Sequence, residues 1–256
     1  MRRVIVAAVV LFSFCILESE TAAVDNANER EVCKETVEVV KSANELGDTA
    51  LHSSSRFGFV NVTSRLIENG ANVNAQNSEG NAPIHLASLY NNNSDTVDVL
   101  IAGGASVTIL NNEGNSPLML SAMNDKYHVA STLIKNGAPV DYARNDGATA
   151  LHIASIKLHA KTVEVLLLKG ANVNSINVEG DTPLHVAIAV HGKEIVNLLL
   201  GPDAYNKLVN MECAPLDSSD LKKNIDVIRL LIAKGANVFA VNKKGQTPLH
   251  LLSKNN

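Results

Sequence analysis

The sequence predicts an all-α fold, a solenoid of stacked helix–turn–helix units from which β-hairpin loops protrude. A repeated motif is the first observation behind this prediction: ATALH at 148–152 returns as DTPLH at 181–185, 33 residues later. Composition is the second, because 46% of the residues are apolar but only 4% are aromatic, which suits a core of small aliphatic side chains between closely packed helices. The third is a glycine at regular intervals, where a helix would end. Self-similarity at a fixed period takes precedence over a domain count based on length.

The repeat period extends through most of the chain. We use the residue that follows each helix-capping position as the marker of a unit. These markers are Ala50, Pro83, Pro117, Ala150, Pro183, Pro215 and Pro248, separated by 33, 34, 33, 33, 32 and 33 residues. The intervals predict a repeat domain at 44–256. Its units are expected near 44–77, 78–111, 112–144, 145–177, 178–209 and 210–242, with a partial unit at 243–256. Before them, valines among charged residues predict a capping helix at 24–43.

Each unit is expected to contain two helices and a loop. Thr or Ser precedes several markers, where its hydroxyl can accept hydrogen bonds from the free amides of a helix start, and Pro is tolerated at the next position. The second helix has apolar residues at helical spacing, such as Val163, Leu166 and Leu167, and ends at a glycine such as Gly170. An Ala-Asn-Val-Asn segment and a glycine turn follow. We therefore expect a protruding hairpin, called a finger below.

These residues resemble ankyrin repeats over about 44–256. The matching segments are TALH at 49–52, APIHLA at 82–87, TALHIA at 149–154, TPLHVA at 182–187, TPLHLL at 247–252, and GANVN at 70–74 and 170–174. The resemblance implies a curved stack of helix pairs with hairpins on the concave side, stabilised by contact between neighbours. It also implies a protein that binds other proteins and is not an enzyme. Departures occur at Pro202, where a second helix should close, and at Asp217, which replaces a histidine; they predict a distorted finger at 201–213.

The amino terminus has the pattern of a secretory signal peptide. Two arginines precede an apolar run from Val4 to Leu17, which is too short to span a bilayer and is followed by small residues. We expect cleavage after Ala23, so that 1–23 is the signal and the mature chain is secreted, with Ser19 as the other site considered. The glycosylation sequons at Asn61 and Asn92 fit this route.

The alternative is an intracellular regulator that resembles small ankyrin-only inhibitors and masks a signalling or transcription partner. Among secreted members of such families are venom components and host-directed effectors, so the resemblance also allows such a role. Outside the signal peptide the cysteines are Cys33 and Cys213. About five units, or roughly 50 Å, separate them, whereas a disulfide needs Cα atoms about 6 Å apart. We therefore expect free or intermolecular thiols.

The sequence contains no recognisable catalytic, metal or cofactor motif. His52, His85, His152, His185 and His250 share one repeated position. Neighbouring units hold them roughly 10 Å apart, too far to share a zinc ion at about 2 Å per bond. We expect each to bond to the backbone of an adjacent loop. No phosphate-binding glycine motif is present, and we expect no cofactor and no catalysis.

The candidate partner-binding surface consists of positions that the repeat pattern leaves free. The first group lies at the ends of the first helices and offers aromatic, Met and aliphatic contacts: Arg56, Phe57, Leu89, Tyr90, Met123, Asn124, Ile156 and Lys157. The second group lies at the fingertips and is mainly acidic: Glu79, Glu113, Asp146, Glu179 and Asp181, with Lys243 and Lys244 on the last finger. The partner is expected to be a protein, with a basic patch favoured by the acidic fingers. A net charge of −4 without a basic cluster argues against nucleic acid. We expect a monomer without stable membrane insertion.

Overall fold

The structure is a computed structural model that describes residues 42–189 and 219–253. The chain forms two compact parts, an amino-terminal part within residues 1–117 and a carboxy-terminal part within 118–256. The expected signal peptide, nearly all of the expected capping helix, both mature cysteines and the expected distorted finger lie outside the described residues.

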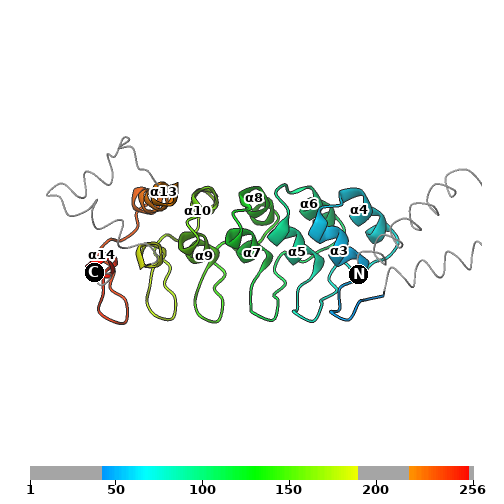
Figure 1. The fold of residues 1–256 in the computed structure, drawn as a ribbon, viewed down its shortest axis with the longest axis horizontal. Helices are drawn as coiled ribbons and strands as arrows, with labels where there is room; N and C mark the ends of the chain where they lie inside the picture. Colours follow the sequence, from blue (N-terminus) through cyan, green and yellow to red (C-terminus); the bar gives the residue numbers. More distant parts are fainter. Residues whose placement is uncertain (1–41, 190–218, 254–256) are drawn as a thin grey trace, which may run out of the picture. The chain divides into compact units, whose positions relative to one another are not determined.

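The amino-terminal part contains two helix pairs. Its helices are α3 (Ala50–Phe57), α4 (Val60–Glu68), α5 (Pro83–Tyr90) and α6 (Asp95–Ala102). α3 packs against α4 and α5, and α6 packs against α4 and α5. The first helices α3 and α5 therefore form one layer, and the second helices α4 and α6 form the other (Figure 1).

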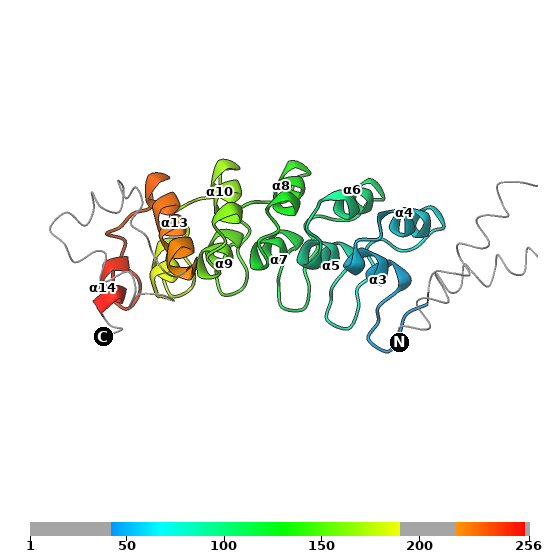
Figure 2. The ribbon, with the colours of Figure 1, turned by 45° about the horizontal axis from the view of Figure 1, so that its top comes forward.

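The carboxy-terminal part repeats this arrangement. Its helices are α7 (Pro117–Met123), α8 (Tyr127–Lys135), α9 (Ala150–Ile156), α10 (Ala160–Leu168), α13 (Ser219–Ala233) and α14 (Pro248–Ser253), and residues 183–189 are also helical. α10 packs against α8, α9 and α13. In Figure 2, the second helices α8, α10 and α13 follow one another along one side of this part.

The predicted caps and helix ends are found. The Thr49 and Thr149 side chains accept hydrogen bonds from the backbone amides three residues on, and Pro83 occupies the first turn of α5. Gly70 and Gly170, which follow second helices, have φ angles of 80° and 90°. Only glycine adopts this left-handed conformation without steric cost. The positions of the helices thus follow from local sequence.

The core lies between the two helix layers. In the amino-terminal part, Leu51 and Ile84 are fully buried, and in the carboxy-terminal part so are Leu151 and Leu166. Burial of such a side chain contributes about 1.5–3 kcal/mol. Leu51, Ile84 and Leu151 stand two residues after a cap, so the repeat motif places one core residue in each first helix. This explains how a chain with few aromatic residues builds a core in each part.

The fold class predicted from the sequence is confirmed, with one difference in the fingers. Within residues 42–189 and 219–253 the only β pairing is an isolated bridge between Ala43 and Thr49. Each finger is closed by turn hydrogen bonds instead; in one, the Asn77 amide donates to the Asn81 carbonyl (3.0 Å) and the Gly80 amide to the Asn77 carbonyl (2.9 Å). The expected β-hairpins are therefore hairpin-shaped loops without a strand ladder.

One step between neighbouring fingers is longer than the repeat period predicts. His152 Nε2 bonds to the Asp181 carbonyl, 29 residues on, but the equivalent His185 Nε2 bonds to the Gln246 carbonyl, 61 residues on. The Lys243 amide also donates to the Glu179 carbonyl (2.9 Å). The fingers at 178–181 and 242–246 are thus direct neighbours. At the marker Pro215, Ala214 stands at the capping position and Asp217 at the position of the repeated histidine. The unit boundaries 178–209 and 210–242 stay a prediction.

Candidate protein-binding surface

Four of the repeated histidines, His52, His85, His152 and His185, link a first helix to the next finger. In α3, His52 Nδ1 accepts from the Thr49 amide (3.1 Å) and Nε2 lies 2.8 Å from the Asn81 carbonyl oxygen. In α5, His85 makes the same pair of contacts with Ala82 and Asn115 (3.0 and 3.1 Å). Because Nδ1 accepts, the proton must be on Nε2, which donates to the carbonyl. The expected bond to the backbone of an adjacent loop is confirmed for His52, His85, His152 and His185.

Burial favours the neutral form of three of these histidines, His52, His85 and His152. Desolvation lowers the pKa of His52 and His152, and lowers that of His85 to about 4, although the carbonyls that they contact act in the opposite direction. All three imidazoles are at most 1% exposed. In the part of the chain that the structure describes, no three His, Cys, Asp or Glu side chains are grouped so that they could hold a metal ion.

An asparagine five residues before most caps shapes the finger, and the sequence analysis missed it. Asn77 Oδ1 accepts from the backbone amides of Glu79 (3.0 Å) and Asn81 (2.9 Å). The same two contacts recur at Asn111, Asn177 and Asn242. Side-chain amides that replace backbone partners in this way stabilise turns. The constant distance of five residues from each cap is a signal that could have revealed them.

Arg144 takes the place of this asparagine in the finger before α9. Its guanidinium forms an ion pair with Asp146, whose carboxylate also accepts from the Ala148 amide. The hydrogen bond from Arg144 lowers the pKa of Asp146 to about 2. Asp146 is half-buried rather than a free fingertip residue, so part of its hydrogen-bonding capacity is used within its own finger.

The other predicted fingertip residues differ in how free they are. Glu79, Glu113, Glu179, Lys243 and Lys244 are exposed. Glu79 and Glu113 accept from the side-chain amides of Asn81 and Asn115, and Lys244 Nζ lies 3.5 Å from Glu179.

Asp181 is more constrained than these fingertip residues. It is half-buried, and its Oδ1 accepts from Asn242 Nδ2 (2.7 Å) on the neighbouring finger. Asp181 therefore holds two fingers together, a task that the sequence did not reveal. Whether these acidic residues contact a partner stays a prediction.

An exposed aromatic patch lies at the ends of the helices in the amino-terminal part. It consists of Arg56, Phe57, Phe59 and Tyr90. The Arg56 guanidinium lies 4.5 Å from the centre of the Tyr90 ring, and the Phe57 and Phe59 rings are stacked 5.8 Å apart. Phe57, Phe59 and Tyr90 are 60%, 50% and 44% exposed, whereas Leu89 is half-buried. Sequence analysis found all of these residues except Phe59, which precedes α4 outside the repeated positions.

The carboxy-terminal part presents its predicted residues at the ends of α7 and α9. Ile156 is 37% exposed, Asn124 and Lys157 are exposed, and Met123 is half-buried. The sequence analysis missed a second set of exposed apolar side chains on two neighbouring fingers of this part: Ile176, Val178, Phe239 and Val241, which are 47–75% exposed. The signal in the sequence is an apolar residue directly before a turn asparagine, as at Ile176 and Val241. This signal is weak, because apolar character alone does not show whether a finger side chain is exposed.

The two sequons lie in different surroundings. Asn61 is exposed in α4, but the Thr63 of its sequon is fully buried and its hydroxyl donates to Ser54 Oγ (3.0 Å). Asn92 is exposed in the loop between α5 and α6. An acceptor in a surface loop is the usual context for glycosylation, so this geometry favours Asn92 over Asn61.

Stacked helix pairs, fingers closed by turns and histidine bonds from four first helices to the next finger define a helical repeat protein. The family model for ankyrin repeats in three copies matches residues 21–109 and 84–177, and the single ankyrin repeat matches 179–210. Because these matches cover more than half of the chain, it belongs to the ankyrin-repeat family. No curated protein matches it.

Membership of this family also narrows the kind of function to consider. Ankyrin repeats generally mediate contact between proteins and are typically non-catalytic. Among the described helices, none has the length and apolar character needed to cross a membrane.

Proposed function

We propose that this chain is a secreted, non-catalytic scaffold that binds a protein partner through its first helices and fingers. The exposed aromatic patch carries the proposal. A soluble fold gains nothing from leaving Phe57, Phe59 and Tyr90 about half exposed, whereas aromatic residues and arginine supply most of the binding energy at protein interfaces. The Arg56 contact with Tyr90 holds both side chains in place before binding, which reduces the entropy lost on association.

Charge favours a basic partner for the amino-terminal part. Residues 42–117 carry seven acidic and two basic side chains, and Glu79 and Glu113 are exposed at its fingertips. Complementary charge steers association and is screened by salt. Raising the salt concentration should therefore weaken binding. An affinity that does not change with salt would contradict the prediction of a basic partner surface.

The patch predicts a strong effect of two substitutions on binding. A Phe57→Ala, Tyr90→Ala double variant is expected to bind the partner captured by the unchanged chain at least about tenfold more weakly, because each side chain is an exposed aromatic anchor. Leu110→Ala is the matched control, since Leu110 is an exposed apolar residue of the same part outside the patch. Binding is measured by surface plasmon resonance. Equal losses for the double variant and the control would contradict the proposal.

Secretion predicts a processed amino terminus. When the full chain is expressed in a eukaryotic cell, the mature protein is expected in the medium with Val24 as its first residue and with any glycan on Asn92. Amino-terminal sequencing and intact mass measure both. An unglycosylated chain that starts at Met1 and stays in the cell would instead support the alternative, an intracellular ankyrin-only regulator. A secreted chain of this kind fits a host-directed effector or a venom component.

A further inference from the structure

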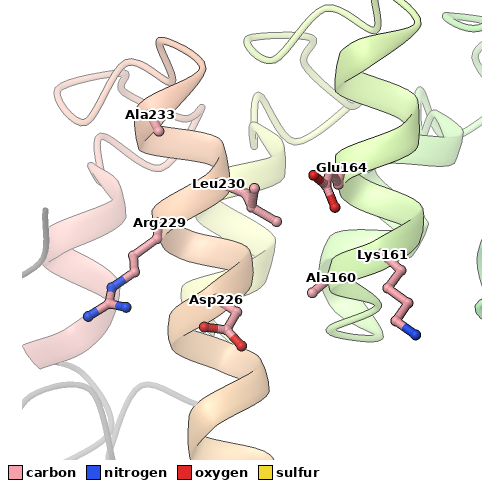
Figure 3. A pocket seen from close by; sticks show the side chains of 7 residues that line it. All are labelled: Ala160, Lys161, Glu164, Asp226, Arg229, Leu230 and Ala233. Carbon is pink, nitrogen blue, oxygen red and sulfur yellow. The ribbon is translucent and has the colours of Figure 1, made fainter. Parts of the chain in front are cut away.

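A cleft of about 400 Å³ lies between two second helices of the carboxy-terminal part, and none of its lining residues belongs to the predicted partner-binding surface (Figure 3). α10 and α13 form its walls, and mainly apolar surface lines it. The lining residues are Ala160, Lys161, Glu164, Asp226, Arg229, Leu230 and Ala233. Its volume falls within the range of known ligand pockets, about 300–1,000 Å³.

A small residue lines the cleft at a position where the equivalent helix has a large one. Tyr127 and Ala160 are the first residues of the equivalent helices α8 and α10. The Lys161 ammonium group of α10 lies 5.1 Å from the centre of the Tyr127 ring. Ala160 has no side chain that could cover the next gap in the same way.

The charges around the cleft are separated by sign. Lys161 Nζ lies over the Tyr127 ring of α8, and Figure 3 shows both Lys161 and Arg229 extending away from the gap. Glu164 and Asp226 lie on the two walls, with Leu230 directed between them (Figure 3). Within the described residues, neither of these carboxylates forms a salt bridge. The cleft thus combines an apolar floor with two acidic groups at its edge.

We propose that this cleft binds a lysine or arginine side chain of a protein partner. Such side chains have an aliphatic stem that can cover apolar surface and a cationic head that stays near water. The stem would lie on Ala160, Leu230 and Ala233, and the head would lie between Glu164 and Asp226. An acidic side chain is repelled there, and a purely apolar one leaves both carboxylates without a partner. None of the lining residues belongs to the aromatic patch, so the cleft serves a second contact.

The test is a titration of the full chain with N-acetyl-lysine amide, followed by NMR of alanine and leucine methyl groups. The expected result is a shift of the Ala160, Ala233 and Leu230 signals. N-acetyl-norleucine amide, which has nearly the same stem without the ammonium group, should bind about threefold more weakly or worse, because an exposed ion pair contributes up to about 1 kcal/mol. Equal affinity for both compounds, or shifts elsewhere only, would overturn the proposal.

Substitutions distinguish the contribution of the two carboxylates to binding from that of the free volume of the cleft. A Glu164→Gln, Asp226→Asn double variant should remove the preference for the lysine compound, and Ala160→Tyr should prevent binding by filling the cleft. Asp98→Asn, at an exposed carboxylate on α6, is the control and should change nothing. Retained preference in the double variant would overturn the proposal. So would tighter binding of cadaverine, which would assign the cleft to a free amine. Phe57→Ala with Tyr90→Ala should leave this binding unchanged, so the two proposals fail independently.

Discussion

Replacing Gly80 by alanine is expected to lower the free energy of unfolding by about 3 kcal/mol or more. Two costs add. Gly80 has a φ of 74°, a conformation that costs an alanine about 1–2 kcal/mol. A Cβ at this position would also lie 2.6 Å from the backbone nitrogen of Asn112 on the next finger, and overpacking of this kind costs roughly 1–3 kcal/mol. Backbone cannot rotate away as a flexible side chain can, so the fingers must move apart.

Gly70→Ala is the matched control for this prediction. Gly70 has a similar φ of 80°, but nothing lies within 4 Å of the position of its Cβ. Only the conformational cost of about 1–2 kcal/mol applies there. Urea unfolding followed by circular dichroism measures both variants. Equal losses would contradict the prediction, because they would show that the close approach of the two fingers at Gly80 does not contribute to stability.

This comparison also shows what the sequence could and could not predict about the fold. A glycine after each helix and in each finger is visible as a pattern, and local chemistry explains its left-handed conformation. The difference between Gly80 and Gly70 depends on Asn112, 32 residues further on. Likewise, the bond from His185 to Gln246 crosses 61 residues, while the marker Pro215 lies at nearly the expected interval. Local motifs predict helices and turns. Which unit packs against which depends on tertiary structure, and local motifs do not show it.

The same limit applies to the candidate surface. Arg56, Phe57 and Tyr90 could be found because they occupy the ends of first helices, where the repeat motif imposes no residue. Phe59 could not, since its exposure depends on how the turn between α3 and α4 places it. Asp181 was predicted to be free and is instead bonded to Asn242. Whether a polar fingertip residue is available to a partner depends on the facing residue of the neighbouring finger. That residue belongs to another unit.

Lowering the pH from 7 to 5 is expected to destabilise the protein by about 2 kcal/mol through His85 alone. Burial lowers its folded-state pKa to about 4, whereas in the unfolded chain a histidine has a pKa of about 6.5. Between these values the unfolded state binds more protons than the folded state, so stability falls as the pH falls through this window and is nearly constant above it. At pH 5 the unfolded-state pKa is about 1.5 units higher than the pH, and each unit corresponds to about 1.4 kcal/mol. His52 and His152 act in the same direction because burial lowers their pKa values too.

The measurement is urea unfolding at several pH values, with His85→Gln as the comparison. Glutamine does not titrate, so this variant should be less stable than the unchanged chain at pH 7, where it lacks the paired contacts to Ala82 and Asn115, and should lose less stability on acidification. The two curves should therefore approach each other towards pH 5. A parallel pair of curves would show that His85 is not the group responsible. Nitrogen NMR of the imidazole gives an independent check, because a neutral ring at pH 5 with its proton on Nε2 is required if the Asn115 carbonyl is to keep its donor.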